Sequence, residues 1–248
     1  MASNNIIQNS PKAWLLAARP KTLSGAAVPV MIGTALAYTD SFGYEGDVFN
    51  WLPAVLCFLF AFIMQINANF INDFFDYIKG TDNVETRLGP RRACAQGWIS
   101  IDAMKRAIAL TTCIACAVGL PLIFYGGLEM ILVGIICVVF CFLYTTHLSY
   151  MGFGDVLVVL FFGIVPVCIP YYIQLHTCTW QTFLASLACG IVIDALLIVN
   201  NYRDRDTDRD AGKQTIIVRW GAKAGQIIYL VTGITACLIG IIFWINGH

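Results

Sequence analysis

Apolar runs of about 18 residues or more recur along this chain, and a run of that length crosses a bilayer core of about 30 Å. Hydrophobic residues make up 58% of the sequence and charged residues only 12%, against about 25% charged in an average soluble domain. These values exclude a water-soluble domain. They predict an all-α fold, a polytopic transmembrane helix bundle that forms a single membrane-embedded domain over residues 1–248.

The hydropathy pattern predicts about seven spanning helices, separated by short polar segments. Glycine and proline within these runs are compatible with membrane helices, because neighbouring helices satisfy the freed backbone groups. The expected spans are Lys21–Thr39, Trp51–Asp76, Ala103–Tyr125, Glu129–His147, Asp155–Ile173, Thr182–Tyr202 and Lys223–Ile245.

The basic residues fix an orientation for these helices. All 15 lysines and arginines fall within residues 12–21, 79–106 and 203–223, which share one side if the N-terminus is cytoplasmic. Cytoplasmic loops of membrane proteins carry such an excess of positive charge. The sequence therefore predicts a multi-pass protein of the cytoplasmic membrane, with its N-terminus and two long polar loops, about 77–102 and 203–222, on the cytoplasmic side.

A first polar motif, NDFFDYIKGTD at residues 72–82, ends the second predicted helix. Asn72 and Asp76 are four residues apart and share one helix face, with Asp73 on the adjoining stripe. Oxygen ligands on one face suit magnesium, which shares its coordination shell with water and phosphate oxygens. A solvated helix end is the alternative, although amides within an apolar run are costly unless they are paired or functional.

A second polar motif, NNYRDRDTDRDAGK at residues 200–213, follows the sixth predicted helix. Asp204 and Asp208 are again four apart, while Asp206 and Asp210 point elsewhere if the segment is helical. The arginines between them also allow a salt-bridged surface helix with no further role.

The two motifs together are more specific than either alone. Both are expected at cytoplasmic helix ends, where their carboxylates can hold two magnesium ions around a diphosphate and neutralise it as a C–O bond breaks. Lys213, with Arg203 or Arg91, can add direct cationic contacts. The apolar interior would take a hydrocarbon tail, so the pattern indicates an enzyme that acts on a lipid diphosphate.

Three further features carry two interpretations each. Residues 19–22 (RPKT) either anchor the first helix or contact diphosphate. Tyr144 is either an interfacial tyrosine or a ring that faces a reacting cation. Asp194, about three turns before Asp204, is either functional or hydrogen-bonded to a neighbouring helix.

These motifs resemble the UbiA-type intramembrane prenyltransferase superfamily, and the resemblance extends from about Trp14 to the end. Other segments resemble its menaquinone-pathway branch: ARPKTLSGAAVPVMIGTALAY, TRLGPRRACAQGWIS, YTTHLSYMGFGDVLVVLFFGIVPV and NNYRDRDTDRDAGKQTIIVRWG. The resemblance implies transfer of a polyprenyl chain from polyprenyl diphosphate to 1,4-dihydroxy-2-naphthoate, with loss of diphosphate and carbon dioxide. It implies no nucleic-acid partner.

The resemblance also assigns roles to residues. It implies that the metal–diphosphate ligands are Asn72, Asp76, Asp204 and Asp208. Asp73 and Asp82 would support them, and Lys213 would contact diphosphate. Further substrate contacts are expected from Arg91, Asn201, Arg203 and Tyr144.

Two departures from the family pattern stand out. Gly80 occupies a position that is commonly acidic in the superfamily, and Asp82 follows two residues later, which favours the naphthoate branch. The family generally has nine helices, so a seven-helix chain is expected to be C-terminally truncated. Prenylation of 4-hydroxybenzoate or homogentisate, and a transporter with a cytoplasmic acidic site, are the alternative functions.

Overall fold

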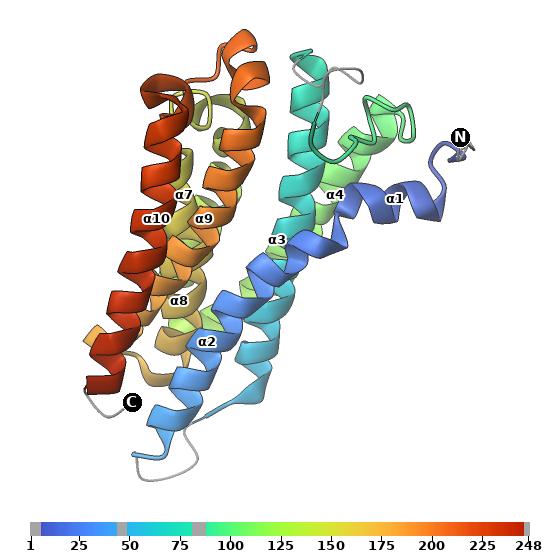
Figure 1. The fold of residues 1–248 in the computed structure, drawn as a ribbon. Coiled ribbons are helices and arrows are strands. Elements are labelled where there is room, and N and C mark those ends of the chain that lie inside the picture. Colours follow the sequence, from blue (N-terminus) through green and yellow to red (C-terminus); the bar gives the residue numbers. More distant parts are fainter. Residues whose placement is uncertain (1–5, 44–48, 81–87, 246–248) are drawn as a thin grey trace.

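The computed structural model describes residues 6–43, 49–80 and 88–245, and every regular element in these ranges is helical (Figure 1). Seven helical segments within the described ranges are long and apolar enough to cross a membrane. They are Pro11–Ser41, Trp51–Ile78, Ile101–Gly126, Glu129–Leu148, Gly154–Leu175, Trp180–Asp210 and Ile216–Phe243. The predicted class and the predicted number of spans are confirmed.

Several spans consist of more than one helical element. The elements are α1 (Pro11–Ala18), η1 (Pro20–Thr22), α2 (Leu23–Ser41), α3 (Trp51–Ile78), α4 (Ile101–Gly119), η2 (Leu120–Leu122), α5 (Ile123–Gly126), α6 (Glu129–Leu143), η3 (Tyr144–Leu148), α7 (Gly154–Val159), η4 (Leu160–Ile164), α8 (Val165–Leu175), α9 (Trp180–Asp210) and α10 (Ile216–Ile245). Among these, η3 and η4 are π-helical turns.

The first span begins earlier than the sequence predicted, because α1 precedes it at an angle (Figure 1). The helix is interrupted at Arg19, whose φ of 51° is left-handed. Pro20 follows directly, and the α conformation is disfavoured for a residue that precedes proline. Asn69 of α3 covers this break by donating to the Ala18 carbonyl and to Thr22 Oγ1, each at 2.9 Å. This buried amide is therefore structural.

The last two spans also differ from the prediction. The sixth was expected to end at Tyr202, but α9 continues to Asp210, so the second acidic motif lies on the helix and not in a loop. The seventh was expected to begin at Lys223, but α10 begins at Ile216 and kinks at Gly221. Polar composition suggested a loop, yet an amphipathic helix end tolerates the same residues.

Close helix contact orders the half of the bundle that contains α9. A Cβ on Gly163 would lie 2.6 Å from the Gly190 Cα, and a Cβ on Gly190 would lie 2.8 Å from the Val159 carbonyl oxygen. Small residues at membrane helix crossings permit this approach. The contact holds α9 directly against the α7–η4 segment within the bundle.

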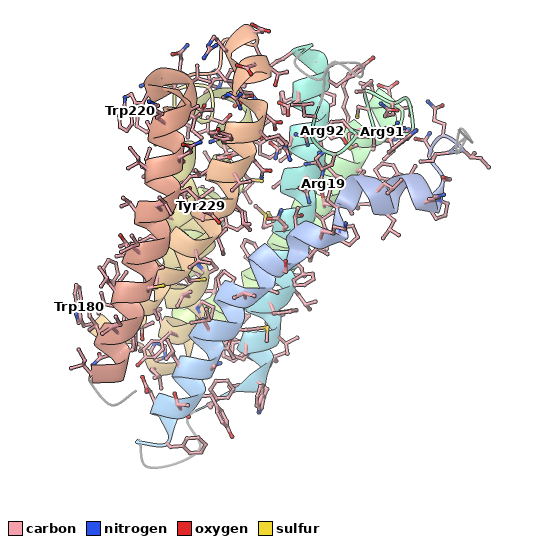
Figure 2. The ribbon with its side chains drawn as sticks, viewed as in Figure 1. Arg19, Arg91, Arg92, Trp180, Trp220 and Tyr229 are labelled. Atoms are coloured by element: carbon pink, nitrogen blue, oxygen red, sulfur yellow. The ribbon has the colours of Figure 1, made fainter. Side chains whose placement is uncertain are left out.

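Side chains at the bundle surface fit a lipid environment. Exposed Trp220 lies at the end of the molecule that carries Arg92, and exposed Trp180 lies near the opposite end (Figure 2). Tryptophan is enriched at both membrane–water interfaces. Large apolar side chains are exposed along α10 between these levels. The protein is a multi-pass membrane protein.

Candidate active site

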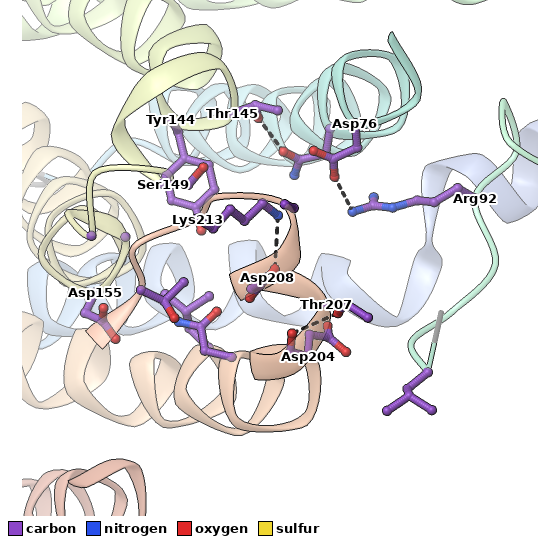
Figure 3. A pocket seen from close by; sticks show the side chains of 18 residues that line it. Asp76, Arg92, Tyr144, Thr145, Ser149, Asp155, Asp204, Thr207, Asp208 and Lys213 are labelled. Carbon is purple, nitrogen blue, oxygen red and sulfur yellow. Dashed lines mark hydrogen bonds and ion pairs between the residues drawn. The ribbon is translucent and has the colours of Figure 1, made fainter. Parts of the chain in front are cut away.

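The C-terminal ends of α3 and α9 converge on one polar pocket of about 160 Å³ (Figure 3). Asn72 and Asp76 of α3 line it opposite Asp204 and Asp208 of α9. Both four-residue spacings thus place their side chains on the pocket face, as predicted. The remaining lining residues include Arg92, Tyr144, Thr145, Ser149, Asp155, Asn201, Thr207 and Lys213.

Asp76 is paired with an arginine from a separate loop. Its Oδ2 accepts a hydrogen bond from Arg92 Nη2 at 3.0 Å, and both side chains are more than nine-tenths buried. Each of these buried charges needs the other, because an isolated charge there would be strongly destabilising. The guanidinium therefore sits at the edge of the acidic pocket.

Asp73, expected to support the metal–diphosphate ligands, faces a loop backbone. Its carboxylate accepts hydrogen bonds from the backbone N–H groups of Ala93 and Cys94, at 2.8 and 2.9 Å, and it is 1% exposed. It does not line the pocket. Asp76, three residues later, is offset from Asp73 by about 60° around the helix axis and faces the pocket. Asp73 thus holds the loop in place from outside the pocket lining.

The loop that Asp73 holds is closely packed. Ala93, Cys94 and Ile99 are buried in a cluster with residues of α1, α3 and α4. The backbone N–H of Asn9 donates to the Trp98 carbonyl at 2.8 Å, which ties the segment before α1 to the same loop. Arg92 consequently projects from a well-anchored turn.

The second motif supplies its own cations from the same helix. Arg203 makes a bidentate interaction with its neighbour Asp204, with both N–O distances at 2.7 Å. Asp206 is 68% exposed on its side chain and pairs with Arg205 and Arg209. The prediction that Asp206 points away from Asp204 and Asp208 is confirmed. The alternative interpretation, a salt-bridged surface helix, therefore applies to the outer face of α9 that carries Asp206.

Lys213 lies between the two acidic motifs. Its Nζ is 3.5 Å from Asp208 Oδ1. Burial works against its positive charge, but the charges of Asp76 and Asp208 outweigh this effect, so the pKa of Lys213 lies above its usual value. Lys213 therefore stays protonated at neutral pH, and its positive charge is stabilised by a carboxylate from each motif.

A π-helical turn brings Tyr144 and Thr145 to the pocket. Thr145 Oγ1 donates to Asn72 Oδ1, which links η3 to the first motif. Lys79 Nζ donates to the carbonyls of Thr145 and Thr146 at 3.3 and 2.6 Å. A π turn inside an α-helix is frequent at functional sites. Here the turn redirects the side chains that close one wall of the pocket.

Beneath the polar pocket lies a larger cavity of about 570 Å³ between the helices. Its wall is mainly apolar, with Phe60, Met64, Phe161 and Phe162 among the lining residues. Four residues line both spaces: Asn72, Tyr144, Thr145 and Leu197. The two cavities therefore meet at the first motif and the π turn.

Some predicted site residues lie elsewhere. Arg91 is exposed and does not line the pocket, and the next residue, Arg92, takes the expected place. Arg203 is not among the lining residues and contacts Asp204 instead, whereas Asn201 and Tyr144 do line the pocket, as expected. Asp82 is outside the described residues.

Several lining residues were missed by the sequence reasoning. Arg92 carried a weak signal, since it directly precedes the apolar pair Ala93-Cys94 and so lies where the loop turns inward. Thr145 adjoins the flagged Tyr144, and Asp155 begins a predicted helix, yet neither had a spacing that linked it to the motifs.

The donor set fits magnesium that shares its ligands with a substrate. Within the described ranges, no three His, Cys, Asp or Glu side chains come close enough to hold a metal by themselves. The pocket instead offers separated oxygen donors on α3 and α9. Magnesium commonly binds one or two carboxylates together with water and substrate phosphates, so these donors suit the ion in the presence of a phosphate-bearing ligand.

A membrane-embedded helix bundle whose acidic pocket opens into an apolar cavity defines an intramembrane protein for amphiphilic ligands. Residues 26–248 match the UbiA prenyltransferase family, and the chain belongs to it.

Curated relatives agree with this assignment. The chain is 35% identical to 1,4-dihydroxy-2-naphthoate octaprenyltransferase of Escherichia coli, covering 92% of this chain and 75% of that protein. It is 34% identical to the protein of the same name from Haemophilus influenzae, covering 98% and 80%. A solved structure from work on digeranylgeranylglyceryl phosphate synthase in membranes has a TM-score of 0.64 at 20% identity, covering 95% and 77%. This last likeness concerns the fold alone.

Proposed function

We propose that this protein transfers a polyprenyl group from polyprenyl diphosphate to 1,4-dihydroxy-2-naphthoate, a step of menaquinone synthesis. The observation that carries the proposal is the junction at Asn72, Tyr144, Thr145 and Leu197, where an acidic pocket meets a large apolar cavity. The relatives named for naphthoate prenylation support the choice of acceptor.

The two cavities match the two parts of a prenyl diphosphate. The apolar cavity is lined from Asn72 to Cys57 on α3, which is about 22 Å at the rise of an α-helix. Burial of a hydrocarbon chain there is favourable relative to water by about 0.8 kcal/mol per CH₂ group. The diphosphate would then lie in the polar pocket, with its first prenyl carbon at the junction.

The chain's own residues divide the work of holding the diphosphate. Asn72 and Asp76 on α3, with Asp204 and Asp208 on α9, would hold the magnesium ions. Bound magnesium supplies charge neutralisation for the departing diphosphate. Lys213 and Arg92 would contact the phosphate oxygens directly, because ionic hydrogen bonds of this kind are strong in a buried site. The ring of Tyr144 would face the allylic carbon as positive charge develops.

Orientation follows from charge. The pocket lies at the end of the bundle that carries the basic segments (Figure 2), and such segments remain on the cytoplasmic side. We propose that the site faces the cytoplasm within the cytoplasmic membrane, and that the acceptor's carboxylate is lost as carbon dioxide.

Two alternatives make different demands on the site. A transporter needs polar groups along the whole crossing, whereas the cavity beyond the first motif is mainly apolar in the described structure. Transfer to 4-hydroxybenzoate or homogentisate uses the same diphosphate chemistry and differs only in the acceptor. The relatives' names favour the naphthoate.

Product analysis tests the proposal. Membranes containing the protein would receive magnesium, polyprenyl diphosphate and each of the three aromatic acids in parallel. We expect a prenylated, decarboxylated naphthalenediol from dihydroxynaphthoate, at a rate at least about 100-fold above that with the other acids. Formation of a benzenoid product at an equal rate would overturn the choice of acceptor, and chelation of magnesium that left the rate unchanged would overturn the metal assignment.

A further inference from the structure

The polar pocket extends beyond the four residues proposed to hold magnesium, as far as Asp155. Asp155 and Arg92 stand at opposite ends of the pocket view, with Lys213 and Asp208 between them (Figure 3). Tyr144 and Ser149 lie on the Asp155 side of Lys213 in this view (Figure 3), and Gly152 and Gly154 also line the pocket. Tyr144 also lines the apolar cavity and so connects the two spaces.

A second carboxyl group is buried on α9, the helix that packs against α7. Asp194 of α9 is 5% exposed, its Oδ1 has no hydrogen-bond partner, and it interacts electrostatically with Asp155. The close contact of Gly163 with Gly190 holds α9 against the α7–η4 segment, so the two carboxyl groups belong to adjacent helices. A buried carboxyl without a partner is costly unless it has a function.

We propose that the Asp155 end of the pocket binds the aromatic acceptor, that Asp155 accepts the proton of the acceptor's hydroxyl group, and that Asp194 is its positioning partner. This inference rests on the proposed prenyl transfer and deepens it. Two carboxyl groups in one low-dielectric site favour a shared proton over two negative charges. That property suits a group that must take up a proton and then return it.

The step balances without any oxidant or reductant. The prenyl C–O bond breaks and the diphosphate leaves with the electron pair. The ring carbon that bears the carboxylate forms the new C–C bond, while the adjacent hydroxyl gives its proton to Asp155 and becomes a carbonyl. The bond to the carboxylate then breaks, carbon dioxide leaves, and the electrons restore the aromatic ring. Asp155 returns the proton to the oxygen, so no net proton is released.

Charge also limits how the acceptor can lie. Its carboxylate would be repelled by Asp155 and needs a cation. Of the two basic side chains that line the described pocket, Arg92 lies at the far end, whereas Lys213 lies between the ends (Figure 3). The acceptor's carboxylate would therefore point toward Lys213, whose three N–H donors it would share with the diphosphate, and its hydroxyl would point toward Asp155.

Asp155→Asn tests the inference, because the amide keeps the shape but cannot take the proton. We expect the rate of naphthoate prenylation to fall at least about 100-fold. Magnesium-dependent binding of prenyl diphosphate should stay within about twofold of the wild type, which also shows that the variant is folded. A prenylation rate within about twofold of the wild type would overturn the proposal.

Small-molecule rescue separates proton transfer from a structural role. Asp155→Ala leaves space for an added carboxylate, and we expect formate to restore part of the lost rate in proportion to its concentration. No restoration in a variant that still binds prenyl diphosphate would count against proton transfer by Asp155. Asp194→Asn should lower the prenylation rate about tenfold, and an unchanged rate would remove Asp194 from the proposal.

Asp206→Asn is the matched control, since this carboxylate lies on the outer face of α9 and pairs only with neighbouring arginines in the described structure. It should prenylate at the wild-type rate. Failure of the proposed function looks different from failure of this inference: in the former case the wild type gives no prenylated naphthoate, and in the latter the wild type is active and Asp155→Asn matches it.

Discussion

The two acidic motifs share a spacing but obtain their cations in different ways. On α3, Asp76 pairs with Arg92, which comes from a loop that Asp73 anchors. On α9, Asp204 pairs with the adjacent Arg203, and Asp208 lies near Lys213 just beyond the helix end. The first motif thus obtains its positive charge from a distant segment through tertiary packing, whereas the second motif contains its own basic residues. Mutations at the first motif should therefore act at a distance, and those at the second should act locally.

The largest effect is expected at the proposed metal ligands, which both motifs supply. Asp76→Ala and Asp208→Ala should each lower the prenylation rate about 100- to 1,000-fold, because each removes negative charge from the metal–diphosphate site. Steady-state assays in membranes would measure this. Asp206→Ala, on the outer face of α9, is the control and should retain activity. Full activity of either pocket variant would show that the two motifs do not both supply metal ligands.

Arg92→Gln should have the next largest effect and should exceed that of Arg203→Gln. Arg92 is nearly fully buried and lines the pocket, whereas the side chain of Arg203 is 34% exposed and lies outside the lining. We expect KM for prenyl diphosphate to rise about tenfold in Arg92→Gln, the cost of losing one buried ionic hydrogen bond. Equal KM values for the two variants would show that both arginines serve the substrate alike.

Asp73→Asn tests the contact between Asp73 and the loop that carries Arg92. The amide replaces one accepting oxygen with a donor that faces a backbone N–H, which costs about 1–3 kcal/mol of stability. KM for prenyl diphosphate should rise a few-fold through the displaced Arg92. A double-mutant cycle tests this link: in an Arg92→Gln background, Asp73→Asn should leave KM unchanged. Additive effects on KM would instead indicate a direct role for Asp73.

Gly89→Ala should have the smallest effect, although it lies where the two halves touch. A Cβ at this position would be 2.8 Å from Nη2 of Arg203, the flexible end of a long side chain. The guanidinium can move by a few tenths of an ångström, so activity should stay within about twofold of the wild type. A loss comparable to that of Arg92→Gln would mean that Arg203 is held more tightly than its exposure suggests.

The sequence by itself determined the features that depend on local order. Apolar length gave the seven spans, the clustering of basic residues gave the predicted orientation, and four-residue spacing put Asn72 with Asp76 and Asp204 with Asp208 on shared faces. Each of these is a property of a single segment, because hydropathy and helical periodicity need no partner.

Tertiary structure alone decided which polar groups serve the pocket. Asp73 and Asp76 belong to one motif, yet one carboxylate binds a loop backbone and the other faces the site. Arg92 took the place expected of Arg91, and Asp155 entered the lining from a segment with no motif of its own. These outcomes depend on how distant segments pack against one another, and the free energies of those contacts are not encoded in the spacing of any one helix.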